Sequence, residues 1–457
     1  MLPPRGRPLN ILLLDFPSDK NRGDAAIHVG LVRLLRRRLP TARLTVMSTF
    51  GANQWPDLLD ELSVTKPLVD EVVGGFRPTF VPIGSRLWQI KRVRQVANVT
   101  AVLAGLWMLP VWPILAATPG LRSLLPRPMQ RTLMAMRSAD LVLWRGRNFR
   151  ANSAGREPFE IWSRLYNPAQ ALMFGKPIAC IGASVWPLRH PLARSMLRRV
   201  LGKAFFVSLR DSSSFASATV LLRDKETRLE LLPDLSLATL AGTDTTVAER
   251  RLPNQPNRLG VTINEWQGYG QIALDGYVRA LVEFLTRFLE RAGTEVVLIP
   301  QVTLETEATG LVEQTLLREL ATDRVRLIVG RPSVDELRSI YAGVDLLVAT
   351  RMHSAIFALC QGTPVVTISY DAGGKWGVLD MMGASDLDVP FSQVSADSLT
   401  HKVESVWARR EALVAAVQAR LPALATAAQA NVDIPVEIFL EGADRTQAPA
   451  HRGDRSE

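Results

Sequence analysis

Residues 344–369 read VDLLVATRMHSAIFALCQGTPVVTIS, and this stretch is the most informative in the chain for its fold. The apolar residues 344–348 predict a buried strand, which a polar turn separates from a helix over 355–360. Gly362 stands where a helix C-terminus favours glycine, and a new strand begins at Pro364. This strand–helix–strand order is typical of an open α/β sheet.

The turn inside this stretch holds two residues that could carry chemistry, Arg351 and His353. They follow the carboxyl end of a buried strand and begin a helix, where backbone N–H groups and the helix dipole favour anions. A guanidinium that grips a carboxylate at two points, two residues from a proton-transfer group, indicates an acidic small-molecule substrate. The alternative is an arginine that caps a neighbouring helix and a histidine that packs.

The same strand–helix pattern recurs along the chain and predicts two domains. A strand over 9–16, a helix with Ile27, Leu31 and Leu34 on one stripe, and a strand over 44–48 form an opening βαβ unit. Further strands are expected at 141–144, 178–182, 205–209, 259–263, 296–299, 325–329, 344–348 and 365–368. The polar residues 241–257 are typical of a linker. The architecture resembles that of GT-B glycosyltransferases, with two doubly wound Rossmann-like domains, 1–240 and 258–440, a ligand cleft between them and a disordered tail, 441–457.

Composition excludes several classes of protein. With 457 residues, 47% hydrophobic and 21% charged, the chain is globular and long enough for two domains. Its two cysteines, Cys180 and Cys360, lie in apolar segments and are expected to be reduced core residues of a cytosolic protein. We find no zinc-type Cys/His cluster, no G-x-G-x-x-G fingerprint and no Walker sequence, so no metal or nucleotide cofactor is predicted.

Residues 76–156 hold thirteen Arg or Lys residues and one acidic residue, Asp140, a balance of +12 that exceeds the net charge of +10 of the whole chain. Charge concentrated in this way does not predict nucleic-acid binding. The basic residues flank an uncharged stretch, 95–121, that contains Trp107 and Trp112. This combination is typical of a segment that lies on an anionic membrane.

Residues 95–121 are long enough to span a bilayer, but Pro110 and Pro113 disfavour a straight helix. The strands on either side are expected to share one sheet, which a single crossing would separate. We therefore predict that the insertion, 76–139, carries a bent monotopic element on the cytoplasmic face of the membrane. The alternative is a pair of buried core helices.

Five short segments, taken in order, resemble the motifs of the polysaccharide pyruvyltransferase family. They are Asn21-Arg22-Gly23-Asp24 (N-x-G-D), Arg210-Asp211 (R-D), Pro233-Asp234 (P-D), Arg351-Met352-His353-Ser354 (R-x-H-S) and Gly362-Thr363-Pro364 with Tyr370 and Lys375 (G-x-P…Y…K). The chain departs from the family at Arg145-Gly146, where a Gly-Gly pair is usual. This departure bears on which acceptor is bound.

The resemblance implies transfer of a pyruvyl group from phosphoenolpyruvate, as co-substrate, to a sugar of a polysaccharide or lipid-linked saccharide precursor. On this interpretation Arg210, Arg351 and Lys375 bind the carboxylate and phosphate of the donor, and His353 is the acid/base. Asp24 orients a sugar hydroxyl or accepts its proton; the alternative is a plain helix N-cap. The remaining residues expected at the acceptor or cleft are Asn21, Gly23, Arg145, Asn148 and Tyr370.

Three alternatives concern single residues or the whole protein. Arg210 could form a structural ion pair with Asp211, and His28 is expected to pack or to face solvent. A GT-B glycosyltransferase that uses a nucleotide-sugar is the second hypothesis for the enzyme, although the acidic pair expected at a donor ribose is not evident. A catalytically inactive scaffold for envelope assembly is the third, and Arg145 in place of glycine is the feature that favours it.

Overall fold

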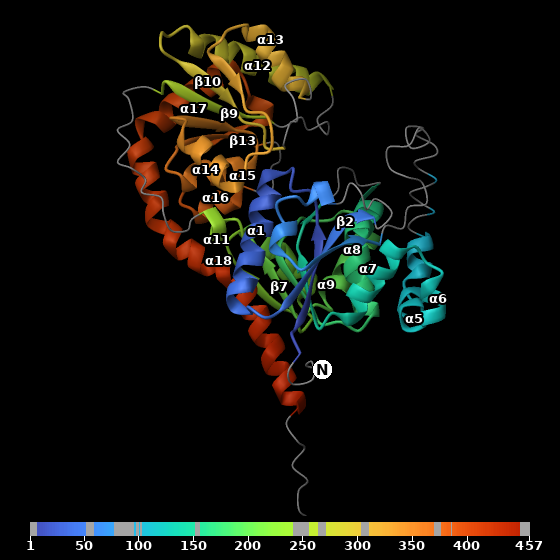
Figure 1. Ribbon diagram of the computed structural model, residues 1–457. Helices are drawn as coiled ribbons and strands as arrows, with labels where there is room; N and C mark the ends of the chain where they lie inside the picture. The colour runs from blue at the N-terminus through green and yellow to red at the C-terminus, as the bar shows by residue number, and fades with distance from the viewer. Residues whose placement is uncertain are drawn as a thin grey trace, which may run out of the picture.

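The computed structural model describes residues 7–51, 59–76, 96, 100, 103–150, 156–240, 256–263, 271–302, 310–369, 376–384 and 386–447. They form two α/β domains, stacked one above the other in Figure 1, each built on a parallel sheet. The predicted fold of two doubly wound, Rossmann-like domains is confirmed.

The first sheet has the order β3-β2-β1-β4-β6-β7-β8, with β5 paired to β6. The strands are β1 (Asn10–Phe16), β2 (Arg43–Gly51), β3 (Glu71–Gly75), β4 (Leu141–Arg145), β5 (Asn148–Phe149), β6 (Ile178–Val185), β7 (Phe206–Leu209) and β8 (Arg228–Leu231). All pairings among them are parallel. The apolar runs of β1 and β4 are buried along their length, as central strands of a parallel sheet require.

Helices connect these strands. They are α1 (Arg22–Arg38), α5 (Val111–Ala117), α6 (Pro119–Ser123), α7 (Arg127–Ser138), α8 (Glu157–Met173), α9 (Pro191–Leu201), α10 (Ser212–Leu222) and α11 (Leu237–Leu240), with the short 3-10 helix η2 (Lys66–Leu68). Asn21 is the N-cap of α1, and its side chain accepts a hydrogen bond from the backbone of Gly23. The order of the strands reverses between β1 and β4, which places the ligand-binding edge of this sheet at their carboxyl ends.

The second sheet has the order β11-β10-β9-β12-β13-β14, again parallel throughout. Its elements are β9 (Arg258–Thr262), α12 (Gln271–Leu289), β10 (Glu295–Leu298), α13 (Leu311–Leu320), β11 (Val325–Leu327), α14 (Val334–Ala342), β12 (Leu346–Ala349), α15 (Met352–Cys360), β13 (Val365–Ser369), α16 (Gly377–Met381), β14 (Asp388–Pro390), η6 (Phe391–Gln393) and α17 (Ala396–Ala408). Here the order reverses between β9 and β12, and Arg351 and His353 follow β12 directly.

A final helix, α18 (Arg410–Gln447), runs along both domains (Figure 1). Leu413 and Val417 belong to the core of the second domain, whereas Val432 and Val436 belong to the core of the first. Asn431 is buried in the first domain, where it accepts from Ser208 Oγ at 2.5 Å. The predicted boundary at 440 therefore needs correction, because the chain returns to the first domain near 430. The helix also continues into the predicted tail as far as Gln447.

The insertion was predicted to carry a bent monotopic membrane element, with buried core helices as the alternative, and one face of α5 is buried in the domain core. The Trp112 ring packs on Phe76, with centroids 4.9 Å apart, and its indole Nε1 donates to Tyr166 Oη at 3.1 Å. Ala116 is also buried, so one face of α5 is part of the domain core. The core alternative is correct for this face because α7 and α8 lie within reach of it.

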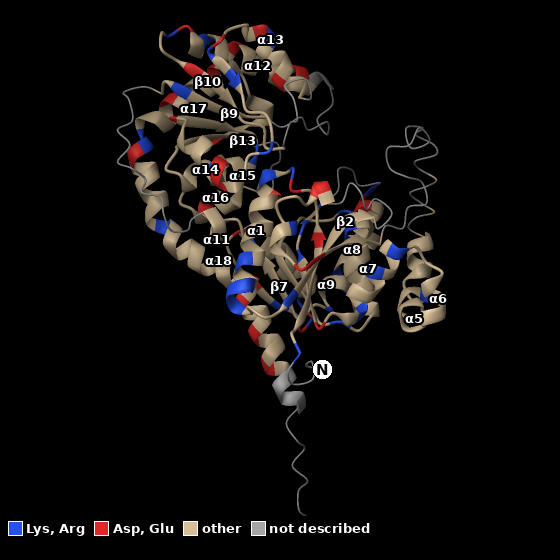
Figure 2. Ribbon diagram, in the orientation of Figure 1, with Lys and Arg blue, Asp and Glu red and all other residues tan. Residues whose placement is uncertain are grey.

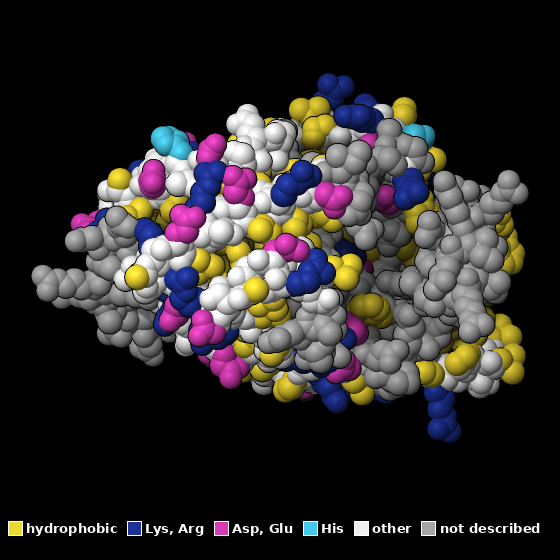
Figure 3. All heavy atoms as spheres, turned by 90° about the horizontal axis from the view of Figure 1, so that it is seen from above, with side chains coloured by type: hydrophobic (Ala, Val, Ile, Leu, Met, Phe, Trp, Pro, Cys, Tyr) yellow, Lys and Arg dark blue, Asp and Glu magenta, His cyan; other side chains and the backbone are white. Residues whose placement is uncertain are grey.

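The other face of the insertion exposes large apolar side chains. The exposed fractions are 74% for Trp107, 59% for Ile114 and 79% for Leu124. Figure 3 shows hydrophobic side chains gathered at the edge of the molecule where α5 and α6 lie, on the right. These two helices carry a single charged residue, Arg122 (Figure 2). Among the described residues, no helix combines the length and the apolar character needed to cross a membrane.

Candidate active site

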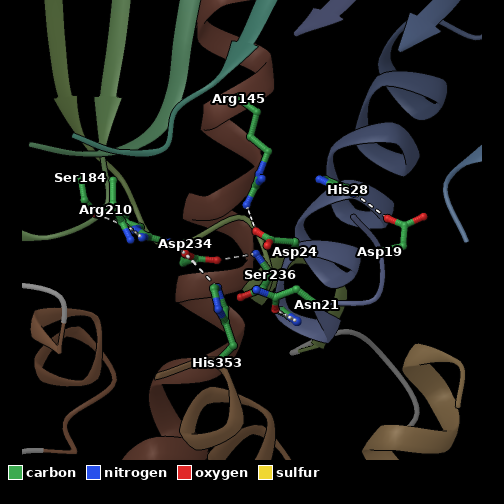
Figure 4. Close-up of polar contacts among 12 residues, drawn as sticks. Asp19, Asn21, Asp24, His28, Arg145, Ser184, Arg210, Asp234, Ser236 and His353 are labelled. Carbon is green, nitrogen blue, oxygen red and sulfur yellow. Dashed lines mark hydrogen bonds and ion pairs between the residues drawn. The ribbon is translucent and has the colours of Figure 1, made fainter. Parts of the chain in front are cut away.

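The polar residues of interest gather where the carboxyl ends of the first sheet face helix α15 of the second domain. The ends of β4 and β7 and the segments that follow β1 and β8 contribute residues from the first domain, and the first turn of α15 contributes His353, which enters from the bottom of the view in Figure 4. In an open parallel sheet this edge is the usual place for a ligand. The site is therefore shared by both domains.

His353 faces a buried carboxylate of the first domain. Its Nε2 atom lies 3.7 Å from Oδ2 of Asp234, which follows β8 and is almost completely buried. Burial favours the neutral form of Asp234, but His353 and Arg210 outweigh this effect and hold its pKa well below the ordinary value. Asp234 is thus an ionised carboxylate that can stabilise a proton on the imidazole of His353.

Arg210 holds this carboxylate in place. It follows β7 directly, and its Nη1 donates to Asp234 Oδ2 at 2.9 Å. Its Nε donates to Ser184 Oγ at 2.8 Å and its Nη2 to Asn148 Oδ1 at 2.6 Å. The alternative of an ion pair with Asp211 is wrong, because Asp211 instead caps α10. The contacts use three of the five N–H groups of the guanidinium.

A second ion pair, between Arg145 and Asp24, lies next to the pair of Arg210 and Asp234. Arg145, the last residue of β4, donates from Nη2 to Asp24 Oδ1 in the first turn of α1. Burial opposes ionisation of Asp24, but Arg145, with smaller contributions from His28 and His353, lowers its pKa. The alternative of Asp24 as N-cap is wrong, because Asn21 occupies that position. The guanidinium of Arg145 and the carboxylate of Asp24 therefore both stay charged in largely buried positions near His353.

Gly23 allows the two domains to approach each other at this point. A Cβ atom at position 23 would lie less than 3.0 Å from the Cβ, Cγ and Nδ1 atoms of His353. Gly23 was expected at the acceptor or cleft. In the structure the group that approaches Gly23 is the imidazole of His353.

The other predicted donor-binding residues lie in different surroundings. Arg351 occupies the N-cap position of α15, and its Nε donates to the carbonyl oxygen of Ile263 at 3.3 Å. Asn148 contacts the site indirectly, because its Oδ1 atom accepts a hydrogen bond from Arg210. The predictions for Tyr370 and Lys375 lie outside the described residues.

A second histidine–carboxylate pair, which was not predicted from the sequence, lies one helical turn after Asp24 on α1. His28 is completely buried, stacks on Phe16 with centroids 4.2 Å apart, and places Nδ1 2.7 Å from Asp19 Oδ1. Burial lowers the pKa of His28, so the neutral imidazole is favoured. Packing was the correct alternative for His28, but its partner Asp19 was not foreseen. The only signal of His28 in the sequence was that it follows Asp24 by four residues, which places His28 and Asp24 on one face of α1.

The arrangement can support proton transfer without a metal ligand set. The part of the chain that the structure describes holds no group of three or more His, Cys, Asp or Glu side chains placed to bind a metal ion. What it holds is an imidazole backed by an ionised carboxylate, with a further carboxylate and two guanidinium groups around it. These are the groups expected of an acid/base site for an anionic substrate.

Solved structures with the same fold include enzymes that bind nucleotide-sugars. A UDP-N-acetylglucosamine 2-epimerase matches with a TM-score of 0.56 at 11% identity, over 96% of this chain and 97% of the epimerase. The Alr3699/HepE protein of Anabaena, solved with UDP-glucose, matches with a TM-score of 0.51 at 14% identity, over 96% and 100%. A glycosyltransferase of Rickettsia africae matches with a TM-score of 0.52 at 11% identity, over 95% and 98%. At these identities the likeness establishes the GT-B-like fold.

Sequence comparison is more specific. The amylovoran biosynthesis protein AmsJ of Erwinia amylovora is 24% identical over 275 residues, which are 53% of this chain and 62% of that relative. The match thus spans less than two thirds of the length of AmsJ. The sequence profile described as polysaccharide pyruvyl transferase matches residues 21–372, from the N-cap of α1 to beyond β13. This range includes Asp24, Arg210, Asp234 and His353, and the chain belongs to the polysaccharide pyruvyl transferase family.

Proposed function

We propose that the protein transfers the pyruvyl group of phosphoenolpyruvate to two hydroxyl groups of one sugar, which forms a ketal. The observation that carries the proposal is the pair of His353 and Asp234, held by Arg210 across the domain interface. The enol phosphate must gain a proton on its methylene carbon before a hydroxyl can attack C2, and this pair can supply one.

The proposed reaction needs one residue that first donates a proton to the donor and later accepts a proton from a sugar hydroxyl. His353 donates a proton to C3 of the donor, and C2 becomes an electron-poor carbon that the first sugar hydroxyl attacks. The proton of that hydroxyl returns to His353. The C2–O bond to phosphate then breaks, the second hydroxyl attacks C2, and its proton leaves with the phosphate. Asp234 stabilises the imidazolium form of His353 at the start of the cycle.

The remaining charged residues are assigned by position. Arg351, at the start of α15, binds the carboxylate of the donor, and the remaining N–H groups of Arg210 face the departing phosphate. Lys375 is proposed to complete the phosphate site. Asp24 orients the attacking hydroxyl, and Arg145 fixes Asp24 in its ionised form.

A donor screen tests this function directly. Isothermal titration of the full-length protein with phosphoenolpyruvate, UDP-glucose and UDP-N-acetylglucosamine should show binding of phosphoenolpyruvate alone. Phosphorus NMR should show release of inorganic phosphate that depends on an added saccharide acceptor. Binding of a UDP-sugar without binding of phosphoenolpyruvate would establish the glycosyltransferase hypothesis instead.

We further propose that the exposed apolar face of residues 107–124, which include α5 and α6, associates with an anionic membrane surface on the cytoplasmic side, where a lipid-linked acceptor would be found. The support comes from Trp107, Ile114 and Leu124, which are exposed on a segment whose other face is anchored by Trp112. Exposed aromatic and aliphatic side chains next to basic residues are typical of interfacial segments. The proposed acceptor is therefore a saccharide, lipid-linked in the cell.

A further inference from the structure

Arg22 is a buried cation for which the described part of the chain provides no paired carboxylate. It is the first residue of α1, its side chain is 2% exposed, and its Nε, Nη1 and Nη2 atoms have no hydrogen-bond partner in the described structure. A guanidinium remains protonated in proteins, so its charge cannot be relieved by loss of a proton. Buried charges of this kind are ordinarily paired, because an unpaired one costs several kcal/mol.

The carboxylates near Arg22 are already engaged. Asp19 accepts four hydrogen bonds, from His28 Nδ1, the backbone of residues 64 and 65, and Thr65 Oγ1. Asp60 pairs with Arg331 and Lys20, and Glu61 pairs with Lys20. The described side chains therefore leave the charge of Arg22 uncompensated.

Arg22 lines a small cavity. It has a volume of about 20 Å³, and Asp19, Lys20, Arg22, Ser63, Arg331 and Leu337 line it. This is room for one species about the size of a water molecule. A water molecule would satisfy a hydrogen bond but would leave the positive charge in place, whereas an anion would satisfy both. The N-terminus of α1 adds its own partial positive charge at the same place.

The cavity lies where the two domains meet. The backbone N–H of Arg22 donates to the carbonyl oxygen of Gln301 at 3.1 Å, and Asn21 forms a β-bridge with Val302. Leu337 belongs to α14 of the second domain, whereas Lys20 belongs to the first. The next residue, Gly23, contacts His353. A species bound here would touch both domains, one residue from the catalytic interface.

We propose that this cavity binds one small monovalent anion of the size of chloride, which neutralises Arg22 and links the two domains. The site is separate from the donor-binding cleft and does not depend on the proposed reaction. Its occupancy should favour the domain arrangement in which Gly23 touches His353.

Thermal unfolding of the full-length protein tests the site. At constant ionic strength, replacement of sodium gluconate by sodium chloride should raise Tm by about 2–4 °C in a saturable way, since gluconate is too large to enter. In Arg22→Met this increment should disappear. Arg33→Met, on the exposed face of the same helix, should keep it and so controls for general salt effects.

A crystal of the wild-type protein grown in bromide gives a test that needs no variant. An anomalous peak in contact with the Arg22 guanidinium is expected. A water molecule without anomalous signal at that position would overturn the proposal, as would a chloride increment of equal size in wild type and Arg22→Met.

Discussion

His353 Nε2 lies 3.7 Å from Asp234 Oδ2, although the two residues belong to different domains. The proposed acid/base residue is thus on one domain and the carboxylate that faces it on the other. Any opening of the interface between α1 and α15 separates them. The competence of the site therefore depends on the arrangement of the domains, and the tests below separate loss of chemistry from loss of that arrangement.

His353→Ala should lower kcat by about two to four orders of magnitude and leave the affinity for phosphoenolpyruvate nearly unchanged. The reason is that the imidazole acts on the proton at C3 and not on the charged groups of the donor. Steady-state phosphate release and calorimetry measure the two quantities. His401→Ala, at an exposed position on α17, is the control. Loss of donor affinity with normal turnover at saturation would show that His353 binds the donor instead.

Asp234→Asn should lower the free energy of unfolding by about 3–5 kcal/mol at pH 6, because Arg210 loses the partner of a buried ion pair. The folded-state pKa of Asp234 lies below the unfolded value of about 3.9, so its stabilisation is complete above that pH. It is lost as the pH falls towards the lower folded-state pKa.

Urea unfolding of the wild-type and Asp234→Asn proteins at pH 6, 4 and 3 measures this effect. The difference between them should shrink as the pH falls below about 4. Asp224→Asn, at an exposed pair with Arg198, should show a much smaller difference. A difference that stays constant with pH would mean that Asp234 is not ionised in the folded protein.

Gly23→Ala should reduce kcat at least tenfold, because the added methyl group displaces either α1 or the imidazole of His353. A misplacement of about 1 Å near a reacting group can cost a hundredfold in rate. Gly276→Ala, on α12 with open space around it, is the matched control and should leave kcat unchanged. Wild-type turnover in Gly23→Ala would show that the close contact is not needed for catalysis.

Arg351→Lys should weaken binding of phosphoenolpyruvate by about thirty- to a thousandfold, since an ammonium group cannot grip a carboxylate at two points. Calorimetry gives the Kd directly. The same change at the exposed Arg33 should have no effect on it. An affinity within twofold of wild type would remove Arg351 from the donor site.

Substitution of Trp107, Ile114 and Leu124 by serine should release the protein from vesicles of phosphatidylglycerol and phosphatidylethanolamine in a sedimentation assay. Turnover on a short soluble acceptor should persist, because these side chains are exposed and Trp112 is retained. High salt alone should release only part of the wild-type protein, since it screens arginine but not apolar burial.

Serine at the equally exposed Leu192 and Val220, outside α5 and α6, is the matched control and should leave vesicle binding unchanged. If the triple variant sediments with vesicles as the wild type does, α5 and α6 are not the membrane-binding element.

The sequence was a reliable guide to elements whose pattern is local. The apolar runs of β1, β4 and β12 and the turn that holds Arg351 and His353 lie where they were predicted, because burial on both faces leaves a continuous hydrophobic signal. Arg210 also lies at the end of a strand, as predicted, and Asp24 lies at the start of the helix that follows β1. Their partners were not predicted, because Arg145 and Asp234 reach them through the sheet order and not through the chain.

The errors have the same origin. Trp112 and Trp107 lie five residues apart in one apolar stretch, yet the first packs in the core and the second faces outward. Composition alone cannot distinguish these faces when prolines interrupt the helical period. The pair of Asp19 and His28 was missed because a carboxylate in a loop gives no signal of the histidine that will pack against it.

Helix α18 has a consequence for protein engineering. Because Val432 and Val436 complete the core of the first domain, the second domain cannot be exchanged as a unit cut at the linker alone. A chimera that takes its second domain from another protein needs a second junction within α18, between Ala428 and Asn431, where the helix passes from one core to the other. Pro422 and Pro435 lie on either side of this crossing, so a junction there disturbs neither of the points at which the helix already lacks a backbone hydrogen bond.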